Sequence, residues 1–173
     1  GQTITVKHSD ATIPYTWVRP LVATNTLFTK ITDSVAPGIF VNNDDYIDFN
    51  IQKLIPHKLS EYGPGLAVAD INGDGLDDML LGGAYGYSPR ALLQQPGGGF
   101  VIKELIPGAS RQTKSSEDMG VLLFDADGDK DQDLYISSGG YESPANTANY
   151  KDLFFINDGK GNFIQDSTAI PSN

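Results

Sequence analysis

The sequence has no cysteine and few basic residues, with 12 Lys and Arg against 22 Asp and Glu. Without cysteine the chain cannot form disulfide bonds, thiolate zinc sites or a cysteine nucleophile. A formal net charge of -10 argues against a surface that binds nucleic acid or anionic membranes, because both need a basic patch to pair with phosphates. The sequence also lacks an apolar run of the roughly 20 residues that a membrane helix requires. We therefore expect no nucleic-acid partner and no membrane insertion of this segment.

Turn-forming residues are abundant, with 19 Gly and 10 Pro among 173 residues. This composition is typical of a folded chain rich in turns, and the length suits one ordinary domain or a piece of something larger. The sequence begins at Gly1 with neither a methionine nor a signal peptide, so we expect it to be a piece of a longer chain.

The acidic residues are unevenly spread. Four of the 22 fall within residues 70–78 and five within residues 125–133. Like charges this close together repel, and a folded protein tolerates them only where water or a counter-ion compensates. The two windows are therefore candidate cation sites.

The chain contains an internal repeat. A shift of 55 residues aligns 65–70 with 120–125, and a shift of 63 residues aligns the later segments 91–100 and 153–163. The second unit therefore carries eight extra residues, which must lie between about 137 and 152. Repetition at this period is the sequence signature of a repeat architecture.

Each unit consists of short apolar or β-branched runs separated by Gly, Asn, Asp and Pro, the pattern of strands joined by turns. Neither unit has a capped amphipathic stretch long enough for a helix. Four strands per repeat predict an all-β fold of propeller-type blades. The expected strands are 65–70, 78–82, 90–95 and 99–106 in the first unit, and 119–125, 133–137, 152–157 and 162–166 in the second.

The segment before the repeats is less regular. Residues 2–7 alternate apolar and polar side chains like a half-buried strand, and residues 11–25 have the prolines of a linker. Residues 27–31 and 46–49 are weaker strand candidates. Residues 54–60 fit either a helical turn or an extended stretch, and the sequence does not decide between them.

The two acidic windows place oxygen-bearing side chains at the same relative positions, 1, 3, 5 and 9. In a tightly curled loop alternate residues point inward, so these oxygens converge, and the carbonyl of position 7 can join them. Calcium suits such a cage because it takes six to eight oxygens at about 2.3–2.6 Å, whereas magnesium demands a strict octahedron and keeps its waters.

Two other interpretations fit the loops less well. An EF-hand needs a bidentate Glu at position 12, but Leu81 and Ile136 stand there, inside apolar runs. Ordinary Asp/Asn/Gly hairpin turns explain one such loop but are a poor explanation for two loops in the same apolar frame. The second loop has Lys130 at position 6, where glycine usually permits the sharp turn, so Gly128 is expected to provide the bend.

These loops, together with the unit endings 96–100 and 157–163, resemble the FG-GAP/VCBS repeats of β-propeller proteins, including integrin α-subunit propellers, whose hairpin loops hold calcium. Residues 48–78 are similar, more narrowly, to large secreted or surface VCBS-repeat proteins of bacteria related to the cartilage acidic protein group. Residues 2–11 resemble the end of an ASPIC/UnbV module. The resemblance implies two Ca²⁺ sites, with Leu76 and Asp131 as carbonyl ligands and the side chains of Asp70, Asn72, Asp74, Asp78, Asp125, Asp127, Asp129 and Asp133 as the other ligands. Asp77 falls outside this set, as a solvated residue.

The repeat and the resemblance together predict four segments. These are the end of a preceding module with its linker at 1–26, lead-in strands at 27–62, repeat 1 at 63–108 and repeat 2 at 118–168. Since a closed propeller needs about four to eight blades, we expect further blades from the same chain or from another subunit.

The predicted function is that of a calcium-binding extracellular or cell-surface module for adhesion, ligand binding or scaffolding, outer-membrane-associated in a bacterium. Its ligand would be an unknown protein or glycan. With two Ca²⁺ ions bound, the formal charge of -10 becomes about -6, which is ordinary for a soluble domain. The alternatives are a part of a secreted polysaccharide-acting enzyme, or a purely structural spacer.

No catalytic residue is predicted. The two histidines are isolated from any nucleophile motif, and carboxylates committed to calcium cannot act as general acids. Tyrosines 85, 87, 141 and 150 are expected in the connections opposite the acidic loops. They are candidates for a recognition surface, or for packing within their own loops.

Overall fold

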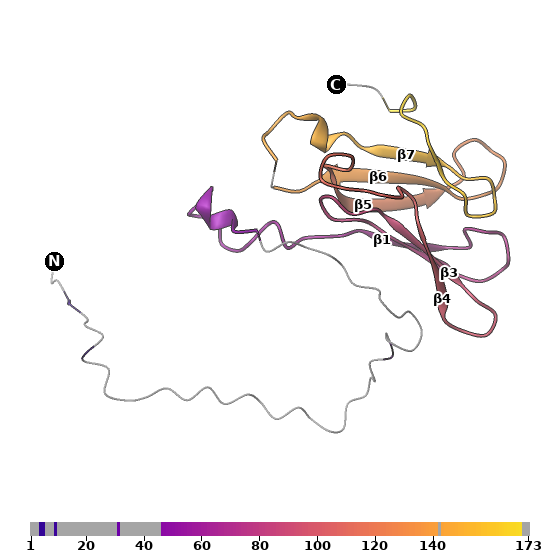
Figure 1. The fold of residues 1–173 in the computed structure, drawn as a ribbon, viewed down its shortest axis with the longest axis horizontal. Coiled ribbons are helices and arrows are strands. Elements are labelled where there is room, and N and C mark those ends of the chain that lie inside the picture. Colours follow the sequence, from indigo (N-terminus) through magenta and orange to yellow (C-terminus); the bar gives the residue numbers. More distant parts are fainter. Residues whose placement is uncertain (1–3, 6–8, 10–30, 32–45, 142, 171–173) are drawn as a thin grey trace. The chain divides into compact units, whose positions relative to one another are not determined.

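A computed structural model of the chain describes residues 4–5, 9, 31, 46–141 and 143–170. The chain divides into two units, Gly1–Lys30 and Ile31–Asn173, and both sheets belong to the second (Figure 1). The predicted strand at 2–7, the linker at 11–25 and the strand candidate at 27–31 fall almost entirely outside the described residues. The predicted division into four segments therefore stays a prediction.

The described part of the second unit is nearly all β-structure. Two four-stranded antiparallel sheets have the strand orders β1-β2-β3-β4 and β5-β6-β7-β8, so each strand pairs with its neighbour in the sequence. No α-helix occurs in the described ranges, and the prediction of an all-β fold built of four-stranded units is confirmed. The strands are β1 (Leu66–Ala69), β2 (Asp78–Leu81), β3 (Arg90–Gln94), β4 (Phe100–Glu104), β5 (Glu117–Phe124), β6 (Asp133–Gly139), β7 (Leu153–Ile156) and β8 (Ile164–Gln165).

The lead-in to the first sheet differs from its predicted form. Residues 46–49 were a strand candidate, but Asp48–Asn50 form a short 3-10 helix, η2. The buried Asp48 carboxylate accepts hydrogen bonds from the backbone N–H groups of Leu59 and Ser60, which folds the lead-in back on itself. Residues 54–60, which the sequence left open, form turns and bends without a regular element.

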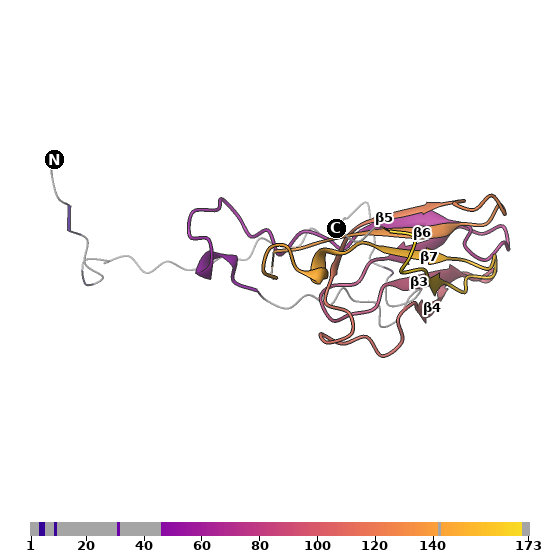
Figure 2. The same ribbon diagram turned by 90° about the horizontal axis from the view of Figure 1, so that it is seen from above.

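The two sheets share one core. Its fully buried members come from both, with Ile71, Leu80 and Ala91 from the first sheet and its loop and Leu134, Ile136 and Phe155 from the second. Burial of such side chains is worth about 1.5–3 kcal/mol for each large residue. The second sheet thus covers one face of the first, and neither sheet holds the core alone (Figure 2).

Close backbone approach joins β1 to β5. The N–H of Gly65 donates to the carbonyl of Asp118 at 2.9 Å, and the N–H of Asp118 donates to the carbonyl of Gly83 at 3.0 Å. A Cβ added to Gly65 would lie 2.9 Å from the backbone nitrogen of Val121, so only glycine allows this contact. A Cβ added to Gly82, just after β2, would likewise lie 2.7 Å from the side chain of Asp118, so the two glycines set the close approach of the first sheet to β5.

Candidate metal centre

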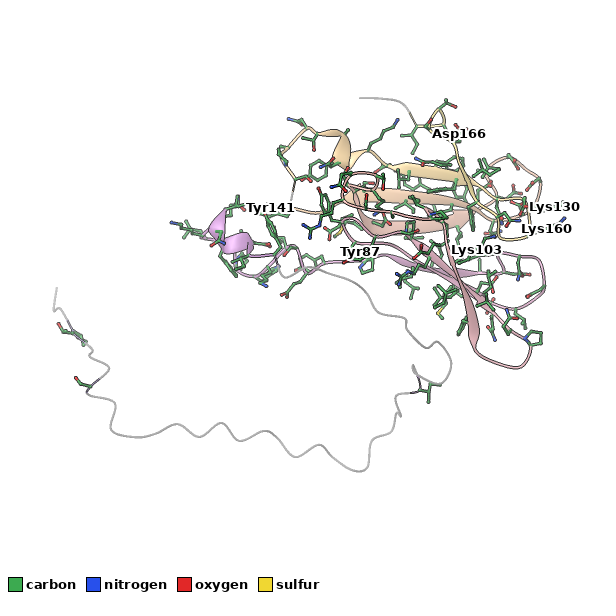
Figure 3. All side chains as sticks on the ribbon, in the orientation of Figure 1. Tyr87, Lys103, Lys130, Tyr141, Lys160 and Asp166 are labelled. Atoms are coloured by element: carbon green, nitrogen blue, oxygen red, sulfur yellow. The ribbon has the colours of Figure 1, made fainter. Side chains whose placement is uncertain are left out.

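The acidic windows form the β1–β2 loop, residues 70–78, and the β5–β6 loop, residues 125–133. Both lie at the same end of the two sheets, where Figure 3 shows Lys130 beside Lys160 of the β7–β8 turn. Tyr87 and Tyr141 lie towards the other end, in the β2–β3 and β6–β7 connections. This is the arrangement that alternating hairpins predict.

The two loops share one hydrogen-bond scheme around position 1. In the first loop, the two carboxylate oxygens of Asp70 accept from the N–H of Gly73 at 2.7 Å and from that of Gly75 at 2.8 Å. In the second, Asp125 accepts from Gly128 at 2.7 Å and from Lys130 at 3.1 Å. The first carboxylate of each loop thus curls the backbone around itself.

Positions 3 and 5 repeat the scheme. Asn72 Oδ1 accepts from the N–H of Asp74 at 3.0 Å, and Asp74 Oδ1 accepts from the N–H of Leu76 at 2.9 Å. The second loop has the same two bonds, from Asp129 N–H to Asp127 Oδ1 at 3.1 Å and from Asp131 N–H to Asp129 Oδ1 at 3.0 Å. Each side chain bonds the backbone two residues on, which is the Asx-turn geometry.

The carboxylate at position 9 also holds the backbone in place, a role that the sequence pattern does not indicate. Asp78 is fully buried, and its carboxylate accepts from the N–H of Ile71 at 3.0 Å and from the N–H of Gln94 at 2.7 Å. Asp133, also fully buried, accepts likewise from Ala126 and Asn157, at 2.9 Å each. Each of these carboxylates ties its own loop to the end of the third strand of its sheet.

Three of the predicted side-chain ligands of the second loop come together. One carboxylate oxygen from each of Asp125, Asp127 and Asp133 lies within 4.8 Å of the others, a group of acids that could hold a metal ion. Two oxygens that bind one Ca²⁺ at about 2.3–2.6 Å can be at most about 5 Å apart. The spacing of these three oxygens fits a single ion of that size.

Asp131 contributes an unsatisfied oxygen at the same place. Its Oδ1 is buried and has no hydrogen-bond partner, while its Oδ2 lies against Gly159 of the β7–β8 turn. Burial, and then the nearby charges of Asp129 and Asp133, raise the pKa of the Asp131 carboxyl to about 6. The carboxylates of the second loop therefore repel one another, and a bound cation would offset this repulsion.

The bend of the second loop corrects the prediction for Lys130. This residue has φ of +78°, as Gly75 has +84° at the same position of the first loop. Gly128 does not replace it, because Gly128 and Gly73 both have positive φ at position 4. A left-handed conformation costs a residue other than glycine about 1–2 kcal/mol, so the rest of the loop holds Lys130 in this strained state.

A hydrogen-bond network between the sheets has no signal in the sequence pattern. Asn157 Nδ2 donates to the carbonyl of Ile71 at 2.8 Å and thereby joins the β7–β8 turn to the first acidic loop. Lys103 of β4 donates to the carbonyl of Gly161 at 2.8 Å and to the side chain of Asn162. The two acidic loops are thus held in one assembly with the turn at 157–163.

The second missed feature is the ion pair between Lys114 and Asp118, which is almost fully buried. Lys114 Nζ lies 2.8 Å from Asp118 Oδ1 and also donates to the carbonyls of Gly83 and Ser116. Burial raises the pKa of the Asp118 carboxyl, and Lys114 partly offsets this effect. The only sequence signal is a base in the segment between the repeats and an acid four residues later, at the start of repeat 2, with no counterpart of the pair in the first unit.

The tyrosine end of the sheets has a cavity of about 1180 Å³. Its lining comes mainly from the β6–β7 connection, including the 3-10 helix η3 (Ala148–Tyr150), and it contains Tyr141, Tyr150 and Asp152. Tyr85, with Arg111 over its ring at 5.8 Å, and Tyr87 lie outside the lining. Both oxygens of Asp152 accept hydrogen bonds, from the Tyr135 hydroxyl and from Ser138 N–H.

Comparison with known proteins gives one match. Residues 70–136, from the first acidic loop through the second and into β6, match the model of the FG-GAP-like repeat family. No curated protein and no solved structure matches the chain. The repeat interpretation of this segment is therefore supported, and the finer resemblance to bacterial VCBS and ASPIC/UnbV proteins stays a prediction.

Proposed function

We propose that the chain is a calcium-binding repeat module in which Ca²⁺ fastens the β1–β2 and β5–β6 hairpins. The convergence of Asp125, Asp127 and Asp133 within 4.8 Å is the main support for this proposal. The hydrogen-bond scheme of the second loop recurs in the first, so the same role is proposed for the side chains of Asp70, Asn72, Asp74 and Asp78. The carbonyl ligand at position 7 is proposed to be that of Leu76 in the first loop and that of Asp131 in the second. Asp129 is the remaining side-chain ligand of the second loop.

The proposed setting of the module is outside the cell, where calcium is millimolar and fills even weak sites. Adhesion, ligand binding or scaffolding suits this setting, because the ion stabilises hairpins and performs no reaction. Among the described residues no helix is long and apolar enough to cross a membrane. Attachment to a bacterial outer membrane would have to be provided by other segments of the protein, and it stays a prediction.

Thermal unfolding with and without calcium tests the proposal. An ion that binds only the folded state adds RT ln(1 + [L]/Kd), about 2.7 kcal/mol at a hundredfold excess over Kd, which corresponds to a rise in midpoint of about 5–10 °C. We expect this rise with Ca²⁺, its reversal by a chelator and a smaller rise with Mg²⁺. Titration calorimetry should give two ions per chain.

Two variants with the same charge change give the matched comparison. Asp127→Asn alters an exposed member of the converging group, and we expect it to weaken calcium binding at the second loop at least tenfold. Asp77→Asn alters an exposed acid outside the ligand set and should leave calcium binding unchanged. An unfolding midpoint that is insensitive to calcium in the unmodified protein contradicts the proposal.

The partner of the module is proposed to bind in the cavity at the tyrosine end. A concave site with aromatic side chains and a few polar groups is the usual composition of a ligand pocket. For a glycan or peptide that a screen identifies, we expect Tyr141→Ala to lower affinity at least tenfold. Tyr85→Ala, a change to a half-buried tyrosine outside the lining, is the control. Equal affinities of both variants and the unmodified protein would place the binding surface elsewhere.

A further inference from the structure

Each sheet has one face in the shared core and one face that is partly open. In the first sheet, the pairing of Leu66 with Leu81 and of Val68 with Met79 places these side chains on the open side. Leu92 and Ile102 continue this side across β3 and β4, and the ion pair of Arg90 with Glu104 lies on it as well. Leu66 is 58% exposed and Val68 is 56% exposed, whereas Leu92 is 4% exposed, so the described residues leave this side open mainly along β1. We call its apolar part the outer face of the first sheet: Leu66, Val68, Met79, Leu81, Leu92 and Ile102.

The second sheet is uncovered on its opposite side. Leu122 pairs with Tyr135, and Tyr135 pairs with Phe154, so the three share one face. Phe124 lies on this face as well, with its ring 6.3 Å from that of Phe154 between centroids. Leu122 is 53% exposed and Ile164 is 73% exposed, whereas Phe154 between them is 8% exposed, so this side is open mainly along β5 and β8. We call this side the outer face of the second sheet: Leu122, Phe124, Tyr135, Phe154 and Ile164.

The internal repeat relates these two outer faces to the contact already formed inside the chain. A shift of 55 residues carries Leu66, Val68, Met79 and Leu81 onto Val121, Leu123, Leu134 and Ile136, which are the side chains that the second sheet packs against the first. The same shift carries Ala67 and Leu80, on the covered face of the first sheet, onto Leu122 and Tyr135. The two outer faces therefore correspond to the two halves of the contact between the sheets.

The side chains of the outer faces differ in size from their counterparts in the shared core. On the covered face of the first sheet stand Ala69 and Ala91, whereas their counterparts on the outer face of the second sheet are Phe124 and Phe154. Phe155, in the shared core, has Leu92 as its smaller counterpart on the outer face of the first sheet. The outer face of the second sheet is therefore bulkier than the covered face of the first, and a contact between the two outer faces would contain larger side chains than the contact inside the chain.

The polar contact between the sheets has counterparts at the uncovered faces too. The donor Asn157, which bonds the carbonyl of Ile71, corresponds to Gln94 at the end of β3. The accepting carbonyl of Ile71 corresponds to that of Ala126 in the second acidic loop. Both apolar and polar halves of the contact are therefore present again at the outer faces.

We propose that the outer face of the first sheet binds the outer face of the second sheet of another copy of this chain, head to tail. The contact between the sheets of one chain is the template for the contact between chains. Because the two faces differ, the interface is heterologous, and repeated association gives a ring if the rotation closes. The proposal does not depend on calcium, since none of the six side chains named for the first face is a candidate ligand.

Molar mass in solution as a function of protein concentration tests the proposal. The unmodified chain should associate, whereas Val68→Glu and Leu122→Glu should each weaken association about 10- to 100-fold, because the contact would bury an unpaired charge. Leu54→Glu changes a side chain that is 97% exposed in the lead-in, and should associate like the unmodified chain. Leu66→Glu and Ile164→Glu form a second pair of variants should either of the first fail to fold.

Mixing the two variants distinguishes head-to-tail contact from a symmetric dimer. The Val68→Glu chain keeps a functional second face and the Leu122→Glu chain keeps a functional first face, so an equimolar mixture should form a dimer that neither variant forms alone. A monomeric unmodified chain at all concentrations overturns the proposal. So does association that only one of the two substitutions removes, because a symmetric dimer uses one face twice.

Discussion

Replacing Lys114 by methionine is expected to lower the free energy of unfolding by about 3–5 kcal/mol, the usual result of breaking a buried ion pair. The Asp118 side chain has no exposed surface, so its charge would stay buried without a cation. The carbonyls of Gly83 and Ser116 would lose their charged donor at the same time. Urea unfolding followed by circular dichroism measures the loss.

A control variant and a double variant test whether the loss comes from the buried charge. Lys151→Met removes an exposed lysine and should change stability by less than about 0.5 kcal/mol. The double variant Lys114→Met/Asp118→Leu should recover most of the loss, because replacing both charges by apolar groups removes the uncompensated one. A loss below about 1 kcal/mol for Lys114→Met alone would show that the ion pair is solvated and not buried as described.

Replacing Phe155 by alanine is expected to cost about 3–5 kcal/mol, the range for truncating a large buried aromatic side chain. Phe155 is 1% exposed and lies in the core that both sheets share. We therefore expect amide protons of β1–β4, as well as those of β5–β8, to exchange faster in this variant. The measurement is native-state hydrogen exchange together with denaturant unfolding.

Phe154→Ala is the matched control, since it removes the same side chain one residue away. Phe154 is also largely buried, at 8% exposed, but it lies on the outer face of the second sheet and outside the core that both sheets share. Its truncation should leave amide exchange in β1–β4 unchanged at protein concentrations where the chain is monomeric. If Phe155→Ala accelerates exchange in the second sheet only, the two sheets unfold independently and the core is not a cooperative unit.

The strands were predictable from the sequence because local chemistry specifies them. Met79–Leu81 and Leu134–Ile136 are apolar runs that follow an Asp/Gly loop directly, and both fall within the observed β2 and β6. The strand predicted at 46–49 failed for a non-local reason. The Asp48 carboxylate bonds backbone N–H groups 11 and 12 residues further on, and no periodicity reports such a contact.

The candidate ligands could be predicted from the sequence because both repeats have oxygen-bearing side chains at the same loop positions. What the repeat could not show is that Asp78 and Asp133 also bond the ends of β3 and β7, since those partners lie 16 and 24 residues away. The ion pair of Lys114 and Asp118 could not be predicted for a different reason. The pair occurs once, where the connection between the repeats enters β5, and its importance comes only from the burial that the packed sheets impose.

The hydrogen-bond scheme of the two acidic loops has a kinetic consequence. Asp70 and Asp125 already hold their loops curled through backbone N–H groups, without help from an ion. A cation that arrives would not have to wait for a loop to close around it. Its rate of capture would then be set by diffusion and by loss of its hydration shell, and the residence time of the ion would carry most of any difference in affinity between the two loops.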